Sequence, residues 1–346
     1  MDNNKQIIKW LNFAKLIAII AVITNHTFQY LYHNQDIVYA SYFSVSLFII
    51  ISGMTSYLSN SRRDETWKES IIRGCKKICL TYLISVVIHE IILFGSFDFL
   101  RYLSHVVYFN ISGPHYYVLL YIQLMIVSRI LFSLLKRYDN TKHSVLFEII
   151  TFFIIVIISS YTTRYTNILN VYGGAGKVLG GTYLILFYLG MLIMKHKIFE
   201  KITFLKSLLC FIVGGISWFV WWKFNCNTGR IVDTYVLFGE GVNPPSIYLM
   251  LSAFFVLITC YGFFTILEKI NVFSKLVDFM FWLGKHTLYI FLYHELILVN
   301  FLFPNFRLSN IWIMRIVVFF VIFVASLLIE YIIELILKQF KKLMKI

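Results

Sequence analysis

The sequence predicts an all-α, polytopic membrane protein: a bundle of about ten transmembrane helices with both termini in the cytoplasm. Hydrophobic residues make up 59% of the 346 residues, charged residues only 14%, and the mean hydropathy is +0.77. These values are far from those of a soluble domain. No soluble segment interrupts the pattern, so residues 1–346 are expected to form a single transmembrane domain.

Ten apolar stretches are long enough to cross a bilayer, because about 20 apolar residues in a helix match the thickness of its hydrocarbon core. In chain order they are 8–30, 37–58, 78–94, 115–135, 145–160, 178–194, 207–224, 246–267, 280–303 and 311–336. The longest outer loop, about 225–245, could cover a substrate mouth or serve only as a connector.

The strongly basic balance is explained by topology. The net charge is +14, and most of the 31 Lys and Arg residues fall in segments that ten spans would place in the cytoplasm. This asymmetry is the positive-inside pattern of membrane proteins. It predicts a multi-pass protein of the plasma membrane with both ends in the cytoplasm, with the lipid bilayer as a partner and with no nucleic acid.

The first apolar stretch carries two ionisable residues, Lys15 and His26, eleven positions apart. Eleven steps of about 100° return to within roughly 20° of the start, so both lie on one helix face, about 16 Å apart along the axis. Ionisable groups at membrane depth are costly and favour a functional interpretation. The structural alternative is a Lys that extends to the inner interface and a His that is hydrogen-bonded within the bundle.

Depth sorts the remaining polar residues into two groups. The outer half is expected to hold His26, the pair His89-Glu90, His115 and the pair His294-Glu295. The inner half is expected to hold Lys15, Arg73, Lys76, Arg129, Lys285 and the pair Ser52-Gly53. This division is the one expected for transfer of a group across the bilayer.

In such a transfer, cations at the inner mouth would hold a phosphorylated donor, and a His higher up would take a proton from an acceptor hydroxyl. A carboxylate could fix the tautomer of that His. Neighbours on a helix point about 100° apart, so Glu295 is not expected to orient His294, and either Glu90 or Glu295 could serve a His on another helix. Arg129 and Lys285 could equally reflect the positive-inside rule, and His89 and His115 could be interfacial residues.

Four ordered stretches resemble the acyltransferase-3 family of bacterial membrane proteins, which acylate surface polysaccharides. Lys15-x10-His26 is similar to the family's basic-x10-His motif, with Lys where Arg is common. Phe43–Met54 resembles a second helix that ends in Phe-x-x-Ser-Gly-aromatic, with Met54 in place of the aromatic residue. Arg73-Gly-Cys-Lys76 matches Arg-x-x-Arg, and Thr287–His294 resembles the closing Tyr-x-x-Tyr-Leu-x-His segment.

The resemblance implies transfer of an acyl group, usually acetyl from cytoplasmic acetyl-CoA, to a hydroxyl of a cell-surface or lipid-linked polysaccharide. His26 would be the general base or the acyl-relay residue. Lys15 would place the donor or balance its charge, and Arg73 with Lys76 would bind CoA phosphates. Ser52-Gly53 would allow either contact with the donor or close helix packing. His294, Glu295, Glu90, His115 and Arg129 would support the site, and no metal is expected.

Two other functions stay open. One is an exporter or flippase for a polysaccharide or lipid-linked sugar, although only four prolines occur and none lies mid-span. The other is a non-catalytic partner of a surface-polysaccharide assembly complex; such assembly proteins are also expected partners of an enzyme.

Overall fold

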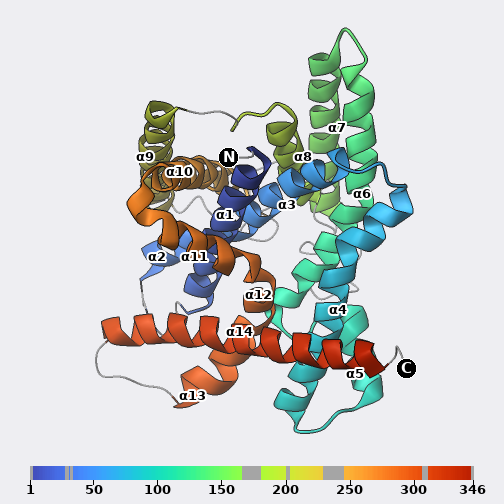
Figure 1. Cartoon of the computed structure of the whole chain (residues 1–346), viewed down its shortest axis with the longest axis vertical. Helices are drawn as coiled ribbons and strands as arrows, with labels where there is room; N and C mark the ends of the chain where they lie inside the picture. Colours follow the sequence, from blue (N-terminus) through green and yellow to red (C-terminus); the bar gives the residue numbers. More distant parts are fainter. Residues whose placement is uncertain are drawn as a thin grey trace.

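The computed structural model describes residues 3–27, 31, 34–165, 181–199, 203–228, 245–305 and 311–343, and in these ranges the chain is built from helices with no β-strand (Figure 1). The first half holds α1 (Asn3–His26), α2 (Gln35–Ser41), α3 (Ser44–Ser61), α4 (Trp67–Phe94), α5 (Phe99–Tyr108), a 3₁₀ turn (Gly113–His115), α6 (Tyr116–Asp139) and α7 (Ser144–Tyr165). The second half holds α8 (Gly181–Lys195), α9 (Phe204–Thr228), α10 (Ile247–Lys269), a 3₁₀ turn (Asn271–Phe273), α11 (Ser274–Lys285), α12 (Thr287–Ile297), α13 (Phe303–Asn305) and α14 (Ile311–Leu343).

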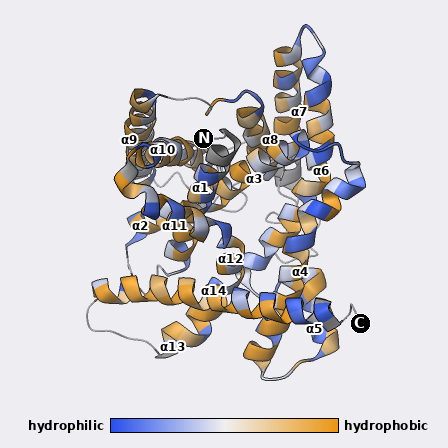
Figure 2. Ribbon diagram, viewed as in Figure 1, coloured by the Kyte–Doolittle hydropathy of each residue, from blue (hydrophilic) through white to orange (hydrophobic). Residues whose placement is uncertain are grey.

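Membrane character is visible in both helix length and surface. Within the part of the chain that the structure describes, six segments are long and apolar enough to span a bilayer: Gln35–Ser61, Trp67–Phe94, Gly113–Asp139, Phe204–Asn227, Ile247–Lys269 and Ile311–Gln339. Apolar side chains remain exposed on the outer faces, among them Leu100 (78% exposed) and Ile316 (71% exposed), and Figure 2 shows this apolar surface along α14. A soluble protein rarely exposes so much contiguous apolar surface.

The all-helical membrane bundle is therefore confirmed, whereas the count of ten spans and the side of each terminus stay predictions. Three further apolar helices, Ser144–Ser160, Tyr183–Lys195 and Thr287–Leu302, are shorter than a full span. The ends of two expected spans, 28–30 and 178–180, lie outside the described residues, as does most of the expected outer loop, 229–244.

The prediction of one continuous span at 280–303 is wrong. Helix α11 ends at Lys285, His286 breaks the axis, and α12 begins at Thr287. A π-helical turn follows at Leu298–Leu302. Such turns inside helices are rare and are frequent at functional sites. The break gives α12 its own direction, and α12 packs against α1, α4 and α14.

Two backbone-to-backbone contacts fix the helices around the site. A Cβ atom at Gly53 of α3 would lie 2.0 Å from the carbonyl oxygen of Phe187 in α8, and one at Gly284 of α11 would lie 2.1 Å from that of Asn12 in α1. Only glycine permits approaches this close, as at other helix interfaces in membranes. The second contact holds the α11–α12 pair against the first half of α1.

Helix α5 lies between α4 and α6. Gly95 ends α4 in the left-handed conformation (φ 68°), and Asp98 caps α5 by accepting a hydrogen bond from the backbone N–H of Arg101 at 3.0 Å. That bond holds the pKa of the exposed Asp98 carboxyl below its usual range. No residue of α5 is fully buried, and Phe99, Leu100 and neighbouring apolar side chains are exposed. A short helix with one apolar face and one polar face is typical of the membrane interface.

Candidate active site

His26, at the end of α1, is in contact with the pair His294-Glu295 in the last turn of α12. The ring centroids of His26 and His294 lie 4.9 Å apart at 83°, an edge-to-face arrangement. Nδ1 of His26 lies 3.9 Å from Oε1 of Glu295, beyond direct hydrogen-bond distance but close enough for an ion pair. The side chain of His26 is 34% exposed, so it remains open to a substrate.

Glu295 is held toward His26 by a separate loop. Its Oε2 atom accepts hydrogen bonds from the hydroxyl of Ser112 at 2.6 Å and from the backbone N–H of Gly113 at 2.8 Å. Glu295 thus lies beside a His on another helix, one of the two arrangements that the sequence left open. A carboxylate placed in this way can orient an imidazole and stabilise its cation.

His294 is buried completely and its tautomer follows from its contacts. Its Nδ1 atom lies 2.7 Å from the carbonyl oxygen of Phe291 and 3.2 Å from that of Ile290. Carbonyl oxygens only accept, so Nδ1 carries the proton and Nε2 presents a lone pair in the neutral ring. Nε2 is buried and has no hydrogen-bond partner among the described residues. His294 can therefore accept a proton or bind a donor group beside His26.

A second pair of histidines lies behind His294. The rings of His89 and His115 have centroids 4.9 Å apart, and the hydroxyl of Ser85 lies 3.3 Å from Nδ1 of His89 and 3.2 Å from Nε2 of His115. Both rings are buried. His115, predicted to open the fourth span, is therefore part of the packed interior, and within the described chain His89 Nε2, His115 Nδ1 and the Tyr293 hydroxyl lack partners.

Glu90 is engaged elsewhere. Its carboxylate is fully buried and accepts a hydrogen bond from Nε of Arg101 in α5, and its other oxygen lies 3.8 Å from Nε2 of His105. The guanidinium of Arg101 also stacks over Phe94, 3.9 Å from the ring centroid. Glu90 therefore anchors α5 to α4, and the described contacts do not bring it to His26.

Lys15 lines a cavity of about 270 Å³ between α1, α3, α4, α6 and the α11–α12 pair. Lys77 and Lys285 also line it, and its hydroxyl groups come from Ser52, Thr55, Thr287, Tyr117 and Tyr121. No Asp or Glu is among the lining residues, and the hydrogen bond from Lys15 Nζ to Asn12 Oδ1 is long, at 3.5 Å. Positive charge without a carboxylate partner is suited to an anionic ligand.

Phe291 connects this cavity to the histidines. It lines the cavity, and its ring centroid lies 6.0 Å from that of His294. Ser52 also lines the cavity; its hydroxyl donates to the carbonyl oxygen of Phe48 at 2.7 Å and lies 3.5 Å from the Tyr117 hydroxyl. Gly53 instead lies in the contact with α8, so packing explains it.

The basic residues predicted for the inner half have different surroundings in the structure. Arg73 donates from Nε to Glu65 at 2.7 Å and also to the hydroxyl of Ser59, so its guanidinium is held at the α3–α4 turn. Lys76 is exposed and is not among the residues lining the cavities, whereas its neighbour Lys77 is. The Arg-x-x-Lys motif contains Lys76 and not Lys77. Adjacent helical residues point about 100° apart, so the two lysines have different surroundings.

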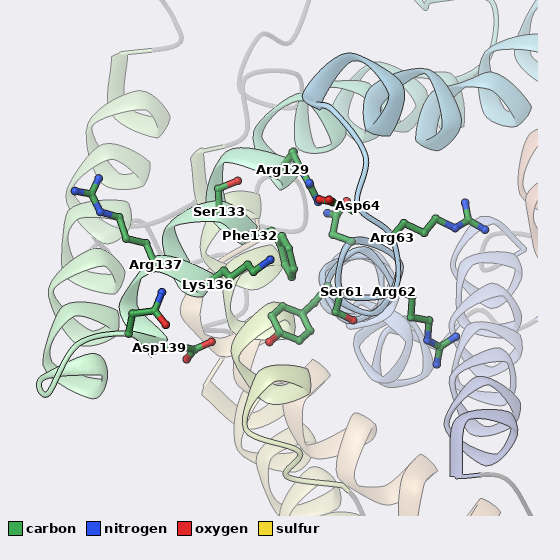
Figure 3. Close-up of a pocket in the computed structure, with 13 residues that line it drawn as sticks. Ser61, Arg62, Arg63, Asp64, Arg129, Phe132, Ser133, Lys136, Arg137 and Asp139 are labelled. Carbon is green, nitrogen blue, oxygen red and sulfur yellow. The ribbon is translucent and has the colours of Figure 1, made fainter.

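Arg129 lines a larger cavity, of about 850 Å³, at the end of α3 and along α6. Its NH2 group donates to the backbone oxygen of Glu65 at 2.5 Å. Figure 3 shows Lys136 reaching toward Phe132, while Arg62, Arg63 and Arg137 extend outward at the rim. The sequence did not single out Arg62 and Arg63, whose only signal is their place in a basic run.

The described residues contain no group of three or more His, Cys, Asp or Glu arranged to hold a metal ion. The site is thus composed of a basic cavity on one side and an imidazole pair with a carboxylate on the other. Such a set can bind an anionic donor and move a proton at a hydroxyl group.

No curated protein and no solved structure matches this chain significantly. A model of the acyltransferase-3 family, described as an acyltransferase domain, matches residues 8–335, nearly the whole chain. That range contains Lys15 and His26, both cavities and the α12 pair. The chain therefore belongs to the acyltransferase-3 family and is a membrane acyltransferase that transfers acyl groups other than aminoacyl groups.

Proposed function

We propose that this protein transfers an acyl group, acetyl in the simplest case, from cytoplasmic acyl-CoA across the bilayer to a hydroxyl of a cell-surface or lipid-linked polysaccharide. It would act in a bacterial plasma membrane alongside surface-polysaccharide assembly proteins. The observation that carries the proposal is the place of Phe291, which lines the lysine-lined cavity and whose ring lies 6.0 Å from that of His294, the partner of His26.

The donor would enter from the side of Arg129. The larger cavity offers five basic side chains (Arg62, Arg63, Arg129, Lys136 and Arg137) to the phosphates of CoA. Helices α3 and α6 line both cavities: Tyr57 and Arg129 line this one, and Thr55 and Tyr121 line the one around Lys15. Lys15 and Lys77 would place the donor arm, so that its thioester approaches the histidines.

His26 would act on the acceptor. As a base it takes the proton of the acceptor hydroxyl, the oxygen attacks the thioester carbonyl, and the carbon–sulfur bond breaks. The proton then passes from His26 to the leaving thiolate, which gives free CoA and an O-acyl ester. Glu295 stabilises the imidazolium between these steps. In the alternative route His26 carries the acyl group first and passes it to the hydroxyl, and the same groups are needed.

The test is proton NMR of surface polysaccharide from a deletion strain complemented with wild type, His26→Ala or the control His143→Ala, whose side chain is exposed in the α6–α7 loop. Loss of O-acyl signals at unchanged polymer yield, in His26→Ala only, supports the proposal and identifies the acyl group. Unchanged acylation with a fall in polymer yield overturns it in favour of an exporter. Immunoblotting of membranes confirms that each variant is present.

A further inference from the structure

A groove of about 440 Å³ runs between α1 and the pair α9–α10, with α2 at one end. Figure 1 shows α9, α10 and α2 gathered on one side of α1. Five residues of α1 line the groove: Phe13, Ile17, Ile20, Ala21 and Thr24. From Phe13 to Thr24 is eleven residues, or about 16 Å of helix, roughly half the thickness of the hydrocarbon core.

The groove offers almost no polar contact to an occupant. Its three hydroxyl groups are turned to their own helices: Thr24 donates to the carbonyl oxygen of Ile20 at 2.9 Å, Ser41 to Val38 at 2.7 Å and Thr259 to Phe255 at 2.8 Å. The rest of the lining is aliphatic or aromatic, apart from Cys260. The one polar side-chain group of the lining without a hydrogen-bond partner among the described residues is the indole N–H of Trp218, so a ligand here gains mainly from apolar contact, as the hydrocarbon chain of a lipid does.

One end of the groove has the character of a membrane interface. Trp218 lines the groove and stacks on Trp222 with ring centroids 5.8 Å apart. Trp222 donates to the backbone oxygen of Asp36 at 2.8 Å, and Lys223 forms an ion pair with the Asp36 carboxylate at 3.4 Å. Tryptophan and charged side chains gather at headgroup level, so a polar headgroup would emerge at this end.

The groove and the lysine-lined cavity lie on opposite faces of α1. Phe13, Ile17, Ile20 and Thr24 recur every three or four residues and share one face, while His26 is two positions, about 200°, from Thr24. Thr24 and His26 share the last turn of α1, so the groove at Thr24 and the imidazole are separated there by the width of the helix, about 10 Å.

We propose that the groove holds the hydrocarbon chain of a lipid-linked carbohydrate acceptor, whose sugar reaches His26 around the end of α1. The proposal rests on the proposed acyl transfer and narrows its acceptor to the lipid-linked class. Donor and acceptor then approach along opposite faces of one helix and meet at its last turn. A lipid with the same hydrocarbon chain but no sugar should bind equally well, so binding can be measured separately from catalysis.

The experiment places the purified protein in phospholipid nanodiscs with a polyisoprenyl phosphate that carries a photoreactive diazirine on its chain. Mass spectrometry of the labelled peptides should place the adducts in α1, α9 and α10. Unlabelled polyisoprenyl phosphate should compete, and an equal amount of phosphatidylglycerol should not. Labels spread over exposed faces such as α14, or equal competition by both lipids, would show a bilayer lipid only and overturn the proposal.

Two variants fill the groove from different helices, Ala21→Trp in α1 and Ala40→Trp in α2. Each should lower labelling about tenfold, the loss expected when roughly two methylene groups lose their burial. Ile316→Trp, on the exposed face of α14, is the matched control and should leave labelling unchanged. Normal labelling in correctly folded groove variants contradicts the proposal; if both variants misfold, the competition in wild type decides.

The readout does not depend on acyl transfer. Specific labelling without any acyl transfer would overturn the proposed function and keep the groove assignment. Acyl transfer that is equally fast to a chain-free acceptor and to a lipid-linked one, with unspecific labelling, would keep the proposed function and overturn the groove assignment.

Discussion

The two ends of the candidate site balance charge in opposite ways. Near the end of α1 the imidazole of His26 faces a carboxylate, that of Glu295, 3.9 Å away. In the cavity around Lys15, three lysines line one space to which no Asp or Glu contributes. Because an uncompensated charge at membrane depth is costly, the second arrangement is suited to a ligand that brings its own negative charge, and the first to holding side chains in place.

The largest expected effect is at the paired end. His26→Ala should lower acyl transfer by about 10³-fold, since general-base and nucleophilic groups contribute on this scale. Acyl-CoA affinity should be unchanged, because the cavity cations remain. Radiolabelled transfer and equilibrium binding in detergent measure the two. If the affinity of His26→Ala for acyl-CoA falls together with its activity, donor binding and chemistry are not divided between the two ends of the site.

Lys15→Met should act on binding. We expect the Kd for acyl-CoA to rise about 10- to 100-fold, the effect of removing one charged partner of a desolvated anion. Lys15→Arg keeps the charge and serves as the matched control, with an affinity near wild type. An unchanged Kd in Lys15→Met, measured at low salt, would contradict an anion site in this cavity.

Glu295→Gln keeps the shape of the side chain and removes its charge. Glu295 lies 3.9 Å from His26 and is not among the residues that line the cavity around Lys15, so we expect kcat to fall about tenfold at constant KM for acyl-CoA, as for other groups that orient a functional His. Ser112→Ala, which removes one hydrogen bond to the same carboxylate, should have a smaller effect. A rise in KM with unchanged kcat would place Glu295 in the donor site.

Gly53→Ala tests packing against donor contact. The added methyl would meet the carbonyl oxygen of Phe187, so the variant should lower the midpoint of thermal unfolding and lose about 1–3 kcal/mol of stability. Gly215→Ala is the matched control, because its methyl would lie 3.9 Å from the nearest neighbour. Normal stability together with weaker acyl-CoA binding would favour the donor-contact role.

The smallest expected difference lies between two adjacent residues. Both lysines are exposed, but only Lys77 lines the cavity around Lys15, so Lys77→Ala should weaken acyl-CoA binding a few-fold and Lys76→Ala should be close to wild type. The reverse ranking, in the same binding assay, would assign the donor to the Lys76 side of α4.

Helix periodicity alone placed Lys15 and His26 on one face, because rotation within a helix is fixed at about 100° per residue. It could not pair His26 with Glu295, 269 positions away, since that pairing depends on how α11–α12 is rotated against α1. The contact of Gly284 with Asn12 sets this rotation, and one glycine in an apolar stretch gives little signal. The break at His286 was missed for a similar reason: no proline marks it.

The interlock of α3 and α8 has a consequence for how the acyl group crosses the membrane. Gly53 meets the backbone of α8, and Gly190 of α8 meets the carbonyl oxygen of Ile50 in return, where a Cβ would lie 2.1 Å away. Backbones in direct contact leave no layer of side chains along which one helix could slide past the other. In the proposed transfer, α3 and α8 would therefore stay fixed relative to each other, and the distance would be covered by the reach of the flexible donor arm rather than by a rocking of these two helices.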